Sequence, residues 1–178
     1  KGIEAKRGMA LRVSTNAFAG MQRAKVIETG LRESGIKHAE ANGVQRTMLV
    51  DLASPLEEVR RKLEGKWRNQ LNQSERNNLI VTEGTDAASW QVFETLYCDM
   101  MARKRFDTTV SIKDFAEIQK VLPEALKLRV FIALAEGEPV AAIACSFMGD
   151  TGIYLLGATN ERALKLRAAN LLQWEAIK

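Results

Sequence analysis

The pattern of apolar and polar positions changes period near residue 157, where a short apolar run passes into an amphipathic segment. Residues 153–156 are apolar or aromatic throughout and end at Gly157, which is typical of a strand covered on both faces. In residues 161–178 apolar side chains recur at helical spacing, which predicts a helix. A strand that enters a helix through small residues places backbone amides at its carboxyl end, where ligands bind in open α/β sheets. We therefore expect a site there; the alternative is a strand–helix unit that serves packing alone.

The elements before this unit complete the pattern of an α/β domain. In order, they are a strand at 79–82, a helix from Thr85 or Asp86 to about Arg105, a helix from Ser111 to Pro123, and apolar runs at 129–135 and 140–147 joined by a tight turn. This order predicts an α/β fold with a mixed, mostly antiparallel sheet flanked by helices.

The first 52 residues predict a separate group of elements. They comprise a strand at 9–15, a helix at about 18–34 that ends at Gly35, and a strong strand at 45–52. We interpret residues 1–52 as the closing elements of a first domain and 53–178 as most of a second domain. The chain begins at Lys1 and stops at Lys178 inside a helical pattern, so we expect it to be an interior piece of a longer protein, with the second domain truncated at its C-terminus.

A basic helix is predicted directly after this boundary. Ser54 as N-cap, Pro55 at the first helical position and Glu57 at the third form a capping box, and the pattern continues to about Arg76. Near the middle of this helix, Lys66, Trp67, Arg68 and Asn69 gather cationic and amide groups within about one turn. This group suits a phosphate, with arginine as the bidentate donor. The alternative is an ordinary charged surface helix.

Composition limits the classes of function. The sequence is 46% hydrophobic and 27% charged, as in ordinary globular proteins, and no apolar run approaches the roughly 20 residues of a membrane span. With no signal-peptide pattern either, we expect a cytoplasmic protein. The net charge of +4 is compatible with an anionic partner. Cys98 and Cys145 are expected to be buried reduced thiols, and His38 is the only histidine, so no metal site is predicted.

Five local strings, taken in order and spacing, resemble a known family. They are RTMLVDL at 46–52, KWRN at 66–69, AEGEPVAA at 135–142, YLLGATN at 154–160 and LLQWEAI at 171–177. The element order is similar to the GNAT N-acetyltransferase fold. The strings more narrowly resemble the Fem-type peptidoglycan bridge-forming aminoacyltransferases, which contain two such domains in tandem.

The resemblance implies a function and its substrates. Proteins of this family move an amino acid from aminoacyl-tRNA to an amine on the peptide stem of a peptidoglycan precursor. The implied partners are therefore tRNA and a UDP-linked or lipid-linked muropeptide, and a lipid-linked substrate would bring peripheral membrane contact. By the same resemblance, Lys66, Arg68 and Asn69 are the expected contacts to the precursor's phosphates, and Tyr154 is expected beside the stem peptide. No catalytic acid or base is assigned.

One departure from the fold's usual pattern bears on the donor. Users of acetyl-coenzyme A in this fold carry an Arg/Gln-x-x-Gly-x-Gly/Ala loop after the central strand, whereas residues 158–169 contain no glycine. We therefore expect no cofactor, with aminoacyl-tRNA rather than acetyl-coenzyme A as the donor. Two alternatives stay open: an N-acyltransferase acting on a small-molecule amine, and a non-catalytic RNA-binding module that uses the basic helix.

Overall fold

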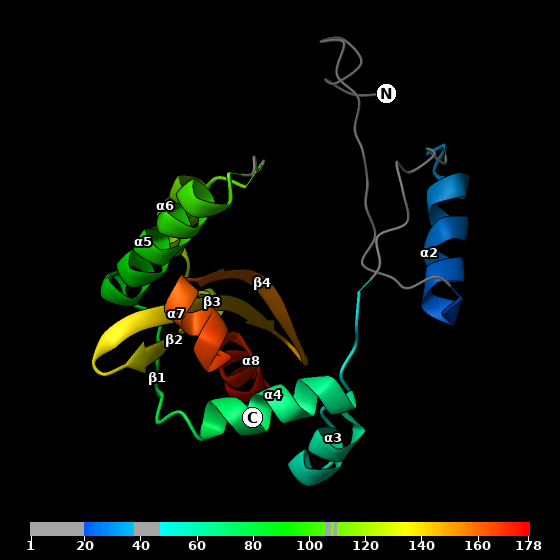
Figure 1. Ribbon diagram of the computed structural model, residues 1–178. Coiled ribbons are helices and arrows are strands. Elements are labelled where there is room, and N and C mark those ends of the chain that lie inside the picture. The colour runs from blue at the N-terminus through cyan, green and yellow to red at the C-terminus, as the bar shows by residue number, and fades with distance from the viewer. Residues whose placement is uncertain (1–19, 38–46, 106–107, 109) are drawn as a thin grey trace. The chain divides into compact units, whose positions relative to one another are not determined.

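The computed structural model describes residues 20–37, 47–105, 108 and 110–178 (Figure 1). The chain divides into two compact units, residues 1–48 and 49–178, which we describe separately. The strand predicted at 9–15 and the residue His38 lie outside the described residues.

The first unit contains α2 (Gln22–Glu33), which confirms the helix predicted at this place. The helix ends as predicted near Gly35, whose φ of 78° is a conformation that glycine adopts without strain. None of the residues of α2 is buried.

The strand predicted at 45–52 is wrong over its described part. Residues 47–52 are assigned no strand, and within the described residues no strand pairs with them. Their apolar side chains are exposed, up to 94% for Met48. The apolar and β-branched residues here favour a strand locally. A strand also needs a neighbouring strand to pair its backbone hydrogen-bonding groups, and composition does not show whether one is present.

The second unit is built on a four-stranded antiparallel sheet, as predicted. Its strands follow the chain in the order β1-β2-β3-β4: β1 (Ile80–Gly84), β2 (Arg129–Ala135), β3 (Glu138–Met148) and β4 (Thr151–Thr159). Glu136 and Gly137 both have positive φ, 55° and 84°, in the turn between β2 and β3. Two such residues give the turn a twist that matches its flanking strands, which explains the predicted hairpin.

Helices cover both faces of this sheet (Figure 1). One face packs against α5 (Ala87–Lys104) and α6 (Ile112–Val121), through a core that contains Trp90 and Phe93. The short 3₁₀ helix η1 (Glu124–Leu126) follows α6. The other face packs against α7 (Glu161–Leu166) and α8 (Ala168–Ile177). The N-caps of α5 and α6 can be recognised in the sequence. The side chains of Asp86 and Ser111 accept hydrogen bonds from the backbone N–H groups of Ser89 and Asp114.

The single basic helix predicted from Ser54 to Arg76 is two helices. They are α3 (Leu56–Lys62) and α4 (Gly65–Glu75), and the chain between them is extended at Leu63. The predicted serine cap is also absent: Pro55 occupies the N-cap position and no side chain caps α3. The break has a physical cause, because the Glu64 carboxylate accepts the backbone N–H groups of Lys66 and Trp67 and so begins a new helix.

The helix predicted at 161–178 is likewise broken into α7 and α8. Arg167, with a φ of 56°, lies between them as the C-cap of α7 and the N-cap of α8. A left-handed residue ends a helix and redirects the chain. Leu164, one of the apolar residues of the predicted helix, is 48% exposed in α7.

Two burial predictions also need correction. Residues 153–155 were expected to be covered on both faces, but their side chains are exposed, 45% for Ile153. The reason is that β4 is the outer strand of the sheet that the structure describes. Cys98 is exposed on α5, whereas Cys145 is buried as predicted.

A third core joins α3, α4 and α8. Leu71 of α4 is completely buried, and it packs in one cluster with Val59, Leu171 and Trp174. This cluster attaches the basic α3–α4 segment to the helix that covers the sheet.

Replacing Leu71 with alanine is expected to lower the free energy of unfolding by about 2–5 kcal/mol, because the change leaves a cavity between α4 and α8. Leu164→Ala makes the same chemical change on an exposed surface and should cost no more than about 1 kcal/mol. Chemical denaturation followed by circular dichroism measures both. Equal losses for the two variants would contradict the assigned core.

Candidate functional site

The predicted phosphate-binding residues lie in the first turns of α4 rather than in the middle of a long helix. Lys66 and Asn69 are exposed, and Arg68 is half-buried. At this helix start, the Glu64 carboxylate accepts the Lys66 and Trp67 amides at 3.0 and 2.9 Å. These two bonds lower the pKa of Glu64 below its ordinary value. Two backbone amides at the start of α4 are therefore already bonded to the Glu64 carboxylate. A phosphate at this place would be bound by side chains rather than by these amides.

Arg68 links the two helices of the basic segment. Its Nη1 atom donates to the backbone carbonyl of Arg61 at 2.7 Å, and a longer contact of 3.5 Å reaches the Leu63 carbonyl. These carbonyls belong to the end of α3, where helical partners are lacking. A guanidinium has five N–H donors, so one edge can hold α3 while donors remain for an anion.

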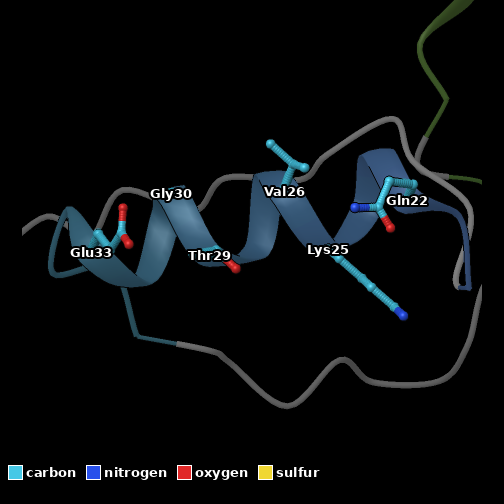
Figure 2. A pocket seen from close by; sticks show the side chains of 6 residues that line it. All are labelled: Gln22, Lys25, Val26, Thr29, Gly30 and Glu33. Atoms are coloured by element: carbon cyan, nitrogen blue, oxygen red, sulfur yellow. The ribbon is translucent and has the colours of Figure 1, made fainter.

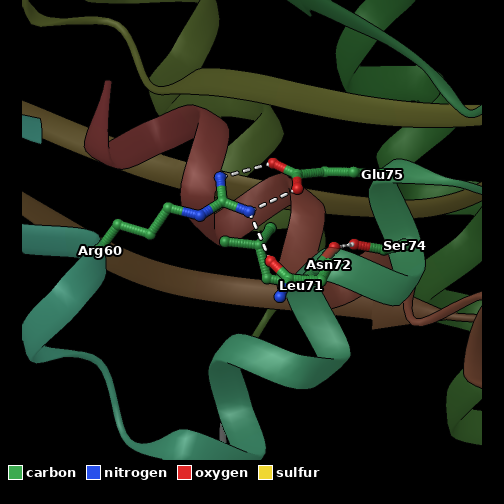
Figure 3. Close-up of polar contacts among 5 residues, drawn as sticks. All are labelled: Arg60, Leu71, Asn72, Ser74 and Glu75. Carbon is green, nitrogen blue, oxygen red and sulfur yellow. Dashed lines mark hydrogen bonds and ion pairs between the residues drawn. The ribbon is translucent and has the colours of Figure 1, made fainter. Parts of the chain in front are cut away.

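A second arginine of the segment makes a tighter set of contacts (Figure 3). Arg60 of α3 donates to both carboxylate oxygens of Glu75 in α4, at 2.8 and 2.5 Å, and to Asn72 Oδ1 at 2.7 Å. Its guanidinium carbon also lies 5.5 Å from the centre of the Trp174 ring. The bidentate bond raises the pKa of Arg60 and lowers the pKa of Glu75. This cluster holds α3 against α4 and α8.

The sequence pattern did not reveal this pairing, because Arg60 and Glu75 are 15 residues apart. In one straight helix that separation would be about 22 Å, well beyond the reach of an ion pair. The break at Leu63 turns α4 back along α3 and brings the two side chains together.

Tyr154 lies on β4 in a different part of the domain, beside a β-bulge. Ala144 of β3 pairs with Leu156, but the next residue, Cys145, pairs with Tyr154, so Leu155 is an extra residue in β4. The shift places Tyr154 on the same face of the sheet as Gly157, the face that α8 covers. A Cβ atom built on Gly157 would lie 2.1 Å from the Tyr154 hydroxyl oxygen. The phenol therefore extends directly over this glycine.

The phenol of Tyr154 has defined neighbours on two further elements. Burial against the sheet, together with Cys145 on β3, raises the pKa of Tyr154, and the polar side chain of Gln173 on α8 lowers it in part. Burial also raises the pKa of the Cys145 thiol to about 11. Both groups are therefore neutral near pH 7, and the phenol is available as a hydrogen-bond donor. Gln173 and Gly157 were not assigned a role from sequence; a glycine inside a strand pattern was the one available signal of a bulge.

The structure groups Lys66, Arg68 and Asn69 on α4 and leaves Tyr154 apart from them. No described hydrogen bond or ion pair joins the two groups. Their assignment as site residues stays a prediction.

The turn from β4 into α7 is held by bonds within the protein. The Asn160 amide donates to the Val140 carbonyl at 3.0 Å, and the Asn160 side chain accepts the Ala163 amide at 2.9 Å. Glu161 adds a carboxylate to the first turn of α7. From α5, Arg103 donates to the carbonyl of Thr159 at 2.7 Å.

Two hollows lie elsewhere in the described residues. The hollow in Figure 2 is lined by six residues that all belong to α2, and the labelled Val26 and Lys25 point to different sides of this helix. A cavity of about 380 Å³ lies between α5 and α6. In the described part of the chain, no three metal-ligating side chains cluster, and no helix has the length and apolarity to cross a membrane.

A comparison with known families decides the identity of the second unit. The family model described as "Acetyltransferase (GNAT) domain" matches residues 57–178, which is more than half of the chain. The chain belongs to this GNAT acetyltransferase family. No curated protein matches the chain. The fold predicted from sequence is thereby confirmed, and the activity of this GNAT domain is acyl transfer.

The GNAT family implies acyl-coenzyme A as a donor, so the turn after β4 must be tested for it. A pyrophosphate binds in this fold to free backbone amides at a glycine-rich turn. Here the amides of Asn160 and Ala163 are already bonded, no glycine is present, and Glu161 brings negative charge to the place where the pyrophosphate would lie. The residues at this turn of the GNAT domain do not fit coenzyme A.

The Arg60–Glu75 pair generates a pH prediction. The folded-state pKa of Glu75 is lowered, so the pair stabilises the fold above the ordinary carboxyl pKa, and this contribution is lost as pH falls through the folded-state pKa. At pH 7, Glu75→Gln should cost on the order of 1 kcal/mol of unfolding free energy. The difference from wild type should shrink toward pH 3. Denaturation at a series of pH values measures it.

Glu117→Gln provides the matched control, since it breaks an exposed pair with Lys120. This variant should differ from wild type by no more than about 0.5 kcal/mol at any pH. A pH-independent cost for Glu75→Gln would contradict the assigned ion pair.

Proposed function

We propose that this GNAT domain transfers an amino acid from aminoacyl-tRNA to an amine on the peptide stem of a peptidoglycan precursor. The single observation that carries the choice of donor is the turn after β4, where the amides of Asn160 and Ala163 are engaged and Glu161 makes the first helical turn acidic. An aminoacyl-tRNA has no pyrophosphate to be bound at this turn. Support for the acceptor comes from the five strings that resemble the Fem-type aminoacyltransferases.

The reaction needs little from the protein beyond positioning and charge. The neutral amine attacks the ester carbonyl of the aminoacyl-tRNA, a C–N bond forms and the ester C–O bond breaks. The amine loses a proton, and the terminal ribose hydroxyl of the tRNA leaves with one. Two large substrates must be held together and the oxyanion stabilised. No covalent enzyme intermediate is required.

The basic segment gives this acceptor a place to bind. Lys66 presents an exposed ammonium, and Arg68 retains N–H donors beyond the one bonded to Arg61. In the proposal both contact the phosphates of the UDP-linked or lipid-linked precursor, with Asn69 beside them, and Tyr154 lies beside the stem peptide. A lipid-linked precursor would bring the protein to the membrane surface, and the tRNA would be its second anionic partner.

The test is transfer of radiolabelled amino acids from a charged tRNA pool to UDP-linked and lipid-linked precursors by the protein in its natural full length. Wild type should label a precursor. Arg68→Ala should raise the KM for the precursor about tenfold or more, because a charge-assisted hydrogen bond is lost. Arg68→Lys should give an intermediate KM, since it keeps the charge and loses the planar fork.

The matched control is Arg76→Ala, which removes the same charge at the other end of α4. Its KM should stay near the wild-type value, and circular dichroism should show that all variants are folded. If Arg68→Ala and Arg76→Ala behave alike, Arg68 makes no phosphate contact. If no precursor is labelled while acetyl-coenzyme A is consumed with a small amine, the domain is a general N-acyltransferase. Salt-sensitive RNA binding without turnover would instead identify a binding module.

A further inference from the structure

The β4 bulge and the glycine beside it call for an explanation. In a regular strand, residues on one face are two apart, so Gly157 would share its face with Leu155. The extra residue at Leu155 changes this count, and Tyr154 takes the position on the α8 face instead. An aromatic residue, rather than a leucine, is thereby brought into line with the glycine.

The contact between the two residues leaves no room for another side chain at position 157 unless the phenol moves. The Tyr154 hydroxyl oxygen would lie 2.1 Å from an added Cβ, and the adjoining ring carbon 3.1 Å from it. Gly157 does not need to be glycine for its backbone, because it is not among the residues with positive φ. Glycine at position 157 is explained by the space that the Tyr154 phenol occupies.

The ring is held but not enclosed. Tyr154 is 52% exposed, although its hydroxyl end lies against Gly157. A purely structural tyrosine would be expected to bury its ring and leave the hydroxyl at the surface. Here the hydroxyl end lies against Gly157, while about half of the residue stays exposed on the outer strand of the described sheet.

We propose that Gly157 is a positioning residue that fixes the Tyr154 hydroxyl at the acceptor-binding face of β4. The proposal rests on the proposed function, in which Tyr154 lies beside the stem peptide. Gly157 acts only through the phenol: it provides the space in which the hydroxyl stays at one place. A methyl group at position 157 displaces the ring toward solvent without removing the hydroxyl.

A double-mutant cycle on the transfer reaction tests this role. Gly157→Ala and Tyr154→Phe should each raise the KM for the precursor about tenfold, the scale of one hydrogen bond, with a much smaller change in kcat. The double variant should be no worse than either single variant, because no hydroxyl remains for the methyl group to displace. Additive losses would mean that Gly157 serves the strand alone and would overturn the proposal.

Gly152→Ala is the matched control. Gly152 also lies on β4 and also faces an aromatic ring, with Phe147 carbons 3.0 and 3.1 Å from an added Cβ. The same change should therefore disturb a ring of the neighbouring strand β3 and leave the precursor KM at the wild-type value. A KM change equal to that of Gly157→Ala would show a general effect on β4, and the proposal would fall.

A second measurement is independent of any substrate. The ultraviolet signal of tyrosinate, taken as the difference between each protein and its Tyr154→Phe counterpart, reports the ionisation of Tyr154. Burial beside Cys145 holds its pKa above the ordinary value, and Gln173 is the other described group that faces it. Gly157→Ala should lower this pKa toward the ordinary value, since the displaced ring becomes solvated. Gly152→Ala should leave it unchanged.

The two measurements separate failure of this inference from failure of the proposed function. If wild type labels no precursor, the proposed function falls, and the titration alone judges Gly157. An unchanged titration in Gly157→Ala overturns the inference whatever the reaction is. A lowered pKa with a raised precursor KM supports both.

Discussion

The packing of α8 between the sheet and α4 is the contact on which the rest of the domain depends. Leu172 on one side of α8 is buried against the sheet, while Leu171 and Trp174 on the other side pack with Leu71 of α4. Arg60 then lies over the Trp174 ring. One ten-residue helix thus connects the sheet, with its candidate acceptor strand, to the basic segment that is a candidate for binding phosphate.

Family membership and local geometry answer different questions about this protein. The GNAT match assigns acyl transfer to residues 57–178. The choice of donor depends on a few backbone amides, and at the turn after β4 two of them are engaged by Val140 and Asn160. A fold can therefore keep its reaction class while the group that delivers the acyl unit changes.

The sequence predicted the strands and the helices α5 and α6 because their signals are local. Caps such as Asp86 and Ser111, the stop at Pro123 and the hairpin turn each act within a few residues. The breaks that separate α3 from α4 and α7 from α8 were missed. Arginine is not a residue type that signals positive φ, so the break at Arg167 has no sequence signal. The N-cap Glu64 resembles one more charged residue on the face of a continuous helix.

The candidate site was predictable only in part for the same reason. The identity of Lys66, Arg68, Asn69 and Tyr154 as candidates came from motif resemblance, and the structure gives their surroundings. Those surroundings depend on tertiary register: one extra residue in β4 decides that Tyr154 faces α8. Periodicity in the sequence cannot show a bulge, since the bulge is defined by the partner strand.

The bulge at Leu155 divides β4 into two segments, and the side chains of each segment alternate between the two faces of the sheet independently of the other segment. Residues after it must keep their alternation between the two faces of the sheet, because Leu156 and Ala158 face the core beneath α5. Residues before it are exposed, and Tyr154 among them is held on the α8 face by its contact with Gly157 rather than by the core. Changes in the outer segment can therefore alter the surface offered to a substrate without disturbing the interior, which makes this strand end a place where related proteins can diverge in specificity at little cost to their stability.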